Sequence, residues 1–281
     1  MSLRLKIWGC RGSVPTPGPN TVTYGGNTSC VELDLGGDTG IVLDAGTGIR
    51  GLGVDLVERG VRRIHLLLTH LHLDHVEGLR FFAPLWDERV ELDLWGPRST
   101  LSGLRDRLLR AFSPPLFPID LRDVPARVRF HDLPGEPLRV DGVVIASSLV
   151  LHPGPTLGYR VETGQSTVAY LPDHEPRLAG ITGKHVEWIS GGAIAHGADV
   201  VLHDAQYAER DYETKIGWGH SSVADAVAFS RAVDAGRLVL FHHEPSYSDH
   251  ALEELEQRAA DLMGDGPRPV LAREGMILEL T

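Results

Sequence analysis

Four side chains that commonly bind metal ions lie within six residues of one another: His70, His72, Asp74 and His75. They directly follow the short apolar stretch 64–68, which is typical of a buried strand. Imidazole and carboxylate are the usual protein ligands of zinc and its first-row neighbours. Side chains at the end of a strand leave the regular ladder and can turn toward one point. We therefore predict a metal site rather than a polar loop that carries histidines by chance.

Three further candidate ligands follow other predicted strands. His152 comes after the stretch 143–151, Asp173 after 167–170, and His242 after 238–241. Any one of them alone would be an ordinary turn residue. Their shared placement favours a common site, because two metal ions a few ångströms apart need about three ligands more than the first cluster supplies, including one that bridges them.

The elements that must position these residues are mostly short strands bounded by turn formers. The sequence predicts strands at 3–8, 29–35, 39–43, 64–68, 92–95, 143–151, 156–162, 167–170, 200–203 and 238–241. It predicts helices at 48–58, 76–80, 98–112, 221–235 and 248–263. Strands dominate each half, so we expect two sheets packed face to face with helices outside them. No repeat or polar linker divides the chain, which indicates a single domain over residues 1–281.

The composition limits the partners that we expect. The formal net charge is −11, which disfavours a basic surface for long nucleic acid but leaves room for a local phosphate pocket. No stretch resembles a membrane span or the apolar region of a signal peptide, so we expect a cytoplasmic protein without a membrane partner. The two cysteines, Cys10 and Cys30, are expected to be buried thiols. Their role is left open.

With these residues in hand, the chain resembles a metallo-β-lactamase-fold hydrolase. The motif His-x-His-x-Asp-His at 70–75 carries the resemblance, the Asp-Ala-Gly-Thr-Gly segment at 44–48 matches the upstream Asp-x-Gly element, and the three later ligand candidates follow in order. It is most similar to the phosphodiesterase branch, which includes ribonuclease Z and phosphoribosyl cyclic phosphodiesterase. Further segments that resemble this branch are 9–13, 24–29, 152–160, 203–205, 219–222 and 241–247.

The resemblance implies an α/β fold, an αββα sandwich of two mixed β-sheets flanked by helices, with two divalent metal ions. It places His70, His72 and His152 on the first ion, Asp74, His75 and His242 on the second, and Asp173 between them. Zn²⁺ is the expected metal, with Mn²⁺ or Fe²⁺ as alternatives. His243 is a rival to His242 for the last position. Asp44 is expected to hold the metal-binding loop through hydrogen bonds rather than to bind metal.

The implied activity is hydrolysis of a small cyclic or nucleotide phosphodiester by a hydroxide held on the dinuclear centre. His220 is the candidate general acid, oriented by Asp204 or His203, and Asp74 is expected to orient or deprotonate the nucleophile. The expected partner is thus a small phosphodiester, not long nucleic acid. A homodimer is left open.

Three other functions compete with this interpretation. One is tRNA 3′-end processing, which the acidic charge and the short stretch 174–202, with its single lysine Lys184 and single arginine Arg177, disfavour. Another is hydrolysis of a carboxylic ester, thioester or lactone by the same centre. The third is a metal-binding sensor without turnover.

Overall fold

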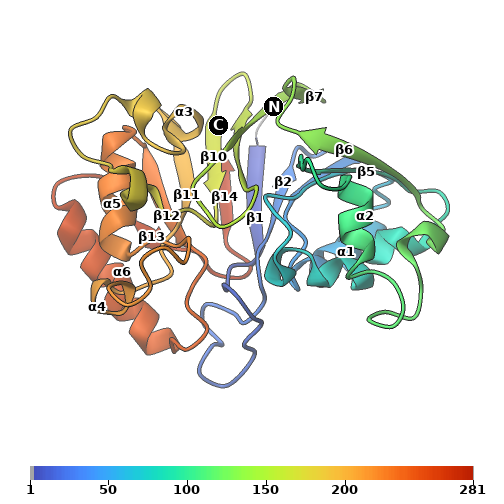
Figure 1. Cartoon of the computed structure of the whole chain (residues 1–281), viewed down its shortest axis with the longest axis horizontal. Helices are drawn as coiled ribbons and strands as arrows, with labels where there is room; N and C mark the ends of the chain where they lie inside the picture. The colour runs from blue at the N-terminus through green and yellow to red at the C-terminus, as the bar shows by residue number, and fades with distance from the viewer. Residues whose placement is uncertain (1–2, 281) are drawn as a thin grey trace.

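Two seven-stranded β-sheets pack face to face at the centre of the molecule, with helices on the outer side of each (Figure 1). The computed structural model describes residues 3–280, and Met1, Ser2 and Thr281 lie outside it. The expected αββα sandwich of two mixed sheets is confirmed.

The first sheet has the order β14-β1-β2-β3-β4-β5-β6. Its strands are β1 (Leu3–Gly9), β2 (Cys30–Asp34), β3 (Thr39–Leu43), β4 (Arg63–Leu67), β5 (Glu91–Pro97), β6 (Arg127–Leu133) and β14 (Ile277–Leu280). β1, β2 and β3 are antiparallel, whereas β3 through β6 are parallel.

The second sheet has the order β13-β12-β11-β10-β9-β8-β7. Its strands are β7 (Leu138–Val140), β8 (Val143–Leu149), β9 (Leu157–Glu162), β10 (Thr167–Leu171), β11 (Val200–Asp204), β12 (Arg237–Phe241) and β13 (Val270–Leu271). β10 through β13 are parallel, so their carboxyl ends lie at one edge of the sheet.

The facing sides of the two sheets bury one continuous hydrophobic core. Leu5 and Val31 of the first sheet and Tyr170 and Leu202 of the second are fully buried in it. β1 shows the pattern that produces this core, because alternate residues along it are buried and partly exposed. Since the sheets share this core, we propose that the chain forms one domain.

Helices cover the outer face of each sheet (Figure 1). They are α1 (Ile49–Glu58), α2 (Leu104–Leu109), α3 (Gly192–Ala195), α4 (Glu209–Tyr212), α5 (Val223–Ala232) and α6 (Asp249–Met263). α1 and α2 pack on the first sheet, and α3, α5 and α6 pack on the second. No helix among residues 3–280 is long and apolar enough to cross a membrane.

Two helix predictions need correction. The helix expected at 76–80 is a pair of 3₁₀ turns, Leu73–His75 and Glu77–Phe81. The backbone there bonds to another loop instead of continuing its own helix: Ala45 N–H donates to the His75 carbonyl (2.8 Å), and Gly78 N–H donates to the Ala45 carbonyl (3.0 Å). The helix expected at 98–112 shrinks to α2, because the backbone N–H of Arg98 is bonded to the end of β6.

The prediction also missed four strands, all at or next to the edges of the sheets: β6, β7, β13 and β14. β6 reads Arg-Val-Arg-Phe-His-Asp-Leu. It is an edge strand that pairs with β5 only, and edge strands commonly carry charged residues, which weaken the apolar pattern by which a strand is predicted. β14 pairs with β1, which lies at the opposite end of the chain, and a local sequence pattern does not reveal such a distant pairing.

Candidate metal centre

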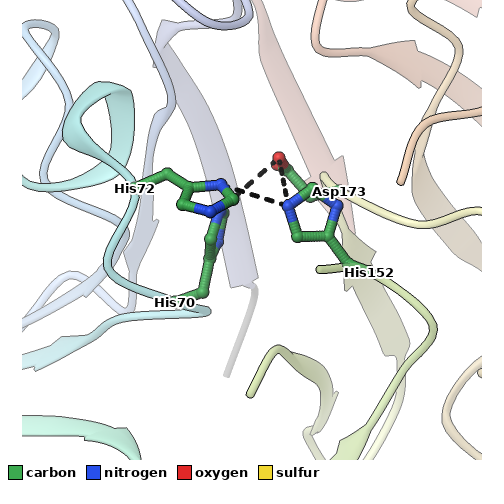
Figure 2. A group of neighbouring side chains, drawn as sticks. All are labelled: His70, His72, His152 and Asp173. Atoms are coloured by element: carbon green, nitrogen blue, oxygen red, sulfur yellow. Dashed lines mark hydrogen bonds and ion pairs between the residues drawn. The ribbon is translucent and has the colours of Figure 1, made fainter. Parts of the chain in front are cut away.

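The seven predicted metal ligands converge in two adjoining groups at the carboxyl ends of the parallel strands. The ligand atoms of the first group lie within 4.8 Å of one another, as do those of the second. The first group is His70, His72, His152 and Asp173 (Figure 2), and the second is Asp74, His75 and His242. Figure 2 shows the rings of His70 and His72 entering from one side and His152 and Asp173 from the other.

Three of these imidazole rings are held by a hydrogen bond at Nδ1. The Nδ1 of His70 lies 3.1 Å from Thr69 Oγ1, that of His75 lies 2.9 Å from an Asp44 oxygen, and that of His152 lies 2.7 Å from the Gly219 carbonyl. Asp44 and the carbonyl only accept, and the Thr69 hydroxyl already donates to Asp44. The rings of His70 and His152 therefore carry their proton on Nδ1 and keep a free lone pair on Nε2.

The Nε2 atoms of the cluster converge with nitrogens of the neighbouring imidazole rings. His152 Nε2 is 3.2 Å from His72 Nδ1, and His75 Nε2 is 3.3 Å from His242 Nε2. His70 Nε2 is buried without a hydrogen-bond partner. Buried polar atoms are normally paired, so the orphaned Nε2 of His70, set among these rings, fits a divalent metal ion.

Asp173 stands between the two groups. Its Oδ2 lies 3.6 Å from His70 and 3.7 Å from His152, while its Oδ1 lies 2.9 Å from His75 and 3.3 Å from His242. One carboxylate oxygen thus faces each group, as a bridging ligand requires. The bridging role that the sequence analysis expected for Asp173 stays a prediction.

The electrostatics of the cluster also suit cations. Burial lowers the pKa of His70 and of His152, so both rings are neutral and ready to bind metal. Burial alone would also lower the pKa of His75, but Asp173, Asp74 and Asp44 together raise it well above its ordinary value. Three carboxylates around one imidazole make an excess of buried negative charge, which a bound cation would offset.

Asp44 makes the loop-holding contacts expected of it. It is fully buried at φ +62° just after β3. It accepts hydrogen bonds from the Thr69 N–H (2.7 Å) and the Tyr170 hydroxyl (3.0 Å), in addition to His75. It thereby ties the metal-binding loop to the ends of β3 and β10.

The choice between His242 and His243 depends on backbone conformation. His242 adopts φ +63°, and its Nε2 lies 3.1 Å from Asp74 Oδ2, inside the second group. His243 points away and bonds the Ala272 carbonyl through Nε2 (2.7 Å). His242, and not His243, therefore lies in the second candidate ligand group.

His220 lies beside both groups and is bound to Asp204, whose Oδ2 is 2.7 Å from its Nδ1. Its ring centroid is 4.9 Å from that of His242 and 5.1 Å from that of His152. Burial would lower the pKa of His220, but Asp204 outweighs burial and raises it to about 9. A protonated imidazole next to the metal groups can donate a proton. Its ligand atom also falls in a group with Asp173 and His242, so the geometry permits metal binding by His220 as well.

The expectation that His203 orients His220 needs correction. His203 Nδ1 bonds the Asp204 carbonyl (2.7 Å), its Nε2 faces His174 Nδ1 (2.9 Å), and its ring stacks on Phe229. Because burial lowers its pKa to about 4, His203 is neutral. The ring is therefore part of a buried hydrogen-bonded pair with His174, and the orienting contact to His220 comes from Asp204 alone.

The sequence analysis missed two contacts to this site. The backbone N–H of Ser13 donates to Asp74 Oδ2 (2.7 Å), and Glu175 lies fully buried two residues after Asp173. The first is a backbone contact, to which side-chain type gives no clue. A lone glutamate beside a predicted ligand carries no pattern in the sequence that marks it as buried.

Comparison with known proteins adds relatives that match nearly the whole chain. A ribonuclease Z from Haloarcula marismortui is 25% identical over 320 residues, covering 98% of this chain and 96% of its own length. This finding contradicts the expectation that long nucleic acid is no partner, because the relative is a ribonuclease. The expectation was wrong because net charge describes the whole surface, whereas a phosphodiester meets only the site, where bound cations set the local charge.

Solved structures show the same fold. The metallo-beta-lactamase fold protein YhfI from Bacillus subtilis has a TM-score of 0.72 at 18% identity, covering 99% of this chain and all of its own. A diphosphatase from the PhnP family has a TM-score of 0.69 at 19% identity and covers 99% of this chain and 98% of its own. The short form of human tRNase Z has a TM-score of 0.66 at 20% identity and covers 99% of both chains.

The family itself is settled by a sequence model. The model described as "Beta-lactamase superfamily domain" matches residues 39–243, a span that contains every residue of the two ligand groups. Divalent metal ions belong to this fold, and the orphaned Nε2 of His70 fits one of them. The chain belongs to the beta-lactamase superfamily and is a metal-dependent hydrolase.

Proposed function

We propose that this hydrolase is a phosphodiesterase that cleaves RNA in the manner of ribonuclease Z, as a tRNA 3′-processing endonuclease. The relatives matched over nearly the whole chain carry that name. The observation that carries the phosphodiester part is the His220–Asp204 pair, which sets a buried proton donor beside both ligand groups. Cleavage of an RNA phosphodiester needs such a donor, because the leaving ribose oxygen is a poor leaving group.

We further propose that two divalent cations, with Zn²⁺ the first candidate, occupy the two groups. His70, His72 and His152 would hold one, Asp74, His75 and His242 the other, and Asp173 both. When bound, such ions supply Lewis acidity toward phosphate oxygens and a water of lowered pKa.

The remaining chemistry is assigned to the side chains of the chain. Asp204 holds the Nδ1–H of His220, so Nε2–H is the proton that His220 gives to the leaving oxygen. Asp74 is held by the Ser13 N–H and lies 3.1 Å from His242, and we assign it the orientation of the attacking water. Asp204 is itself fixed by backbone N–H groups of Gln206 (3.0 Å) and Ser221 (3.1 Å).

A small cyclic or nucleotide phosphodiester is the second candidate substrate. The described residues between Asp173 and β11 form two 3₁₀ turns and the four-residue helix α3. This compact segment, over its described residues, includes no extended arm.

The test is to load the purified chain with Zn²⁺ or Mn²⁺ and offer three substrates: a precursor tRNA with a 3′ trailer, a panel of cyclic phosphodiesters, and bis-p-nitrophenyl phosphate. We expect cleavage of the precursor at one position near its 3′ end. Turnover of cyclic diesters with intact precursor would favour the second candidate. Failure to hydrolyse any diester with any divalent metal would contradict both.

A further inference from the structure

Glu175 is a buried carboxylate that neither the metal centre nor the acid uses directly. Its side chain is completely inaccessible and accepts three hydrogen bonds. The Tyr212 hydroxyl (2.8 Å) and the Gly217 N–H (2.8 Å) reach Oε1, and the Gly219 N–H (2.6 Å) reaches Oε2. All three donors are neutral groups, so these hydrogen bonds hold the carboxyl in place without a cationic donor.

The donor at Oε2 connects Glu175 to a metal ligand. Gly219 gives its N–H to Glu175 and its carbonyl oxygen accepts a hydrogen bond from His152 Nδ1 at 2.7 Å. Glu175 is thus connected through one glycine residue to the imidazole whose Nε2 faces His72. Carboxylates that bond a ligand histidine directly are known to set its tautomer and ring orientation, and here a glycine residue lies between the two.

The backbone at position 219 requires glycine. Gly219 adopts φ +96°, and a Cβ at this position would lie 2.2 Å from Pro153 Cδ and 2.3 Å from His152 Nδ1. Only glycine lets the peptide come this close to the ring. The next residue is His220, so the same anchor also sets where the candidate acid begins. In addition, the Glu175 backbone N–H donates to the Leu151 carbonyl (2.9 Å), one residue before His152.

We propose that Glu175 is a positioning residue of the metal centre: through Gly219 it fixes His152 with the proton on Nδ1 and Nε2 free to bind metal. This inference rests on the proposed role of His152 as a ligand, within the proposed function, and is independent of the identity of the substrate. It assigns the segment 217–219 to the assembly of the site, in addition to its presentation of His220.

The first test is Glu175→Gln in the full chain. The substitution keeps the size of the side chain but presents an amide N–H₂ to one of the two glycine N–H groups. Competition with a chromophoric chelator measures Zn²⁺ affinity, and we expect the dissociation constant to rise at least about 10-fold, the usual effect of losing an outer contact to a ligand. The matched control is Tyr212→Phe. It removes a hydrogen bond to the same carboxylate, but this bond is not part of the connection through Gly219 to His152. We expect this variant to bind Zn²⁺ like the wild type.

A second readout needs neither metal nor substrate. In the metal-free protein, ¹⁵N spectra of the histidines report which ring nitrogen of His152 is protonated, and we expect Nδ1 in the wild type and a mixture of tautomers in Glu175→Gln. If that variant does not fold, Gly219→Ala tests the same path, because its Cβ displaces His152. Unchanged Zn²⁺ affinity in the folded variants, or an unchanged His152 tautomer, would overturn the proposal. A wild type that binds Zn²⁺ but cleaves no diester would reject the proposed function and leave this inference standing.

Discussion

Two buried aspartates, one on each sheet, are built alike but serve different histidines. Asp44 directly follows β3 and Asp204 ends β11, and both are fully buried. Each accepts backbone N–H groups and the Nδ1 of one imidazole: His75 for Asp44 at 2.9 Å, and His220 for Asp204 at 2.7 Å.

The two histidines differ in what faces the rest of the ring. The Nε2 of His75 lies 2.9 Å from Asp173 and 3.3 Å from His242, in the middle of the second ligand group. The ring of His220 stacks on that of His242 at the margin of the same group. The comparison teaches that one device, a buried carboxylate behind an imidazole, prepares either a metal ligand or a proton donor, depending on what the other ring nitrogen meets.

The largest expected effect comes from removing the acid. His220→Ala should lower the rate on an RNA substrate by about 10²- to 10⁴-fold, the usual contribution of general acid catalysis. The loss should be much smaller on bis-p-nitrophenyl phosphate, whose leaving group needs little protonation. Metal content, measured by elemental analysis, should stay at the wild-type level. If metal is lost as well, His220 is itself a metal ligand, and its role no longer differs from that of His75.

Asp44→Asn should act on metal binding instead of on proton transfer. The amide N–H₂ would face either the His75 Nδ1–H or the Thr69 N–H, so the ring loses its fixed orientation. We expect Zn²⁺ affinity to fall by about 10- to 100-fold. Chelator competition measures the fall, with Asp204→Asn as the matched variant that keeps its metal. Equal metal loss in the two variants would contradict the division of roles.

The third prediction concerns the titration of His220 in the metal-free protein. Burial would lower its pKa, but Asp204 raises it to about 9. Since the pKa is raised on folding, the charged ring stabilises the fold fully below its ordinary value of 6.5, and this stabilisation is lost as pH rises through about 9. In Asp204→Asn burial still lowers the pKa and only Asp173 and Asp74 remain to raise it, so the pKa of His220 should fall below about 9. NMR titration of the ring protons measures both, and an unchanged pKa would show that Asp204 is not its cause.

The smallest expected effect comes from removing the hydrogen bond that Tyr170 of the opposite sheet donates to Asp44. Tyr170→Phe removes the hydroxyl that donates to Asp44 at 3.0 Å and leaves the ring packed against Phe241. We expect a loss of about 1 kcal/mol in the free energy of unfolding, typical of one hydrogen bond. Urea denaturation measures it. A much larger loss would mean that the two sheets depend on this contact more than the comparison suggests.

Much of the site was readable from the sequence because metal ligands combine a distinctive residue type with a distinctive place. His70, His72, Asp74 and His75 are neighbours in the chain, so one loop brings them together. His152, Asp173 and His242 are far apart, yet each follows a strand, and parallel strands gather their ends at one edge. The resemblance to a known family supplied the assignment of each residue to the first ion, to the second ion or to the bridge between them.

Other parts of the site could not be predicted, because they depend on contacts between distant segments. Glu175 is an ordinary glutamate until the loop at 212–219 folds over it and brings in three donors. His203 has the same residue type and strand-end position as a ligand, but its ring packs against Phe229 and His174.

The sequence by itself determined the type of fold, the candidate ligand set and the class of chemistry, because strand patterning and histidine spacing are local properties. Only the tertiary structure decided which ring of His242 and His243 faces the centre, which aspartate serves which histidine, and which buried glutamate supports the ligand loop. The reason is physical. A hydrogen bond of 2.7 Å needs two groups placed by the packing of both sheets, and residue order says nothing of such distances until the core that joins them has formed.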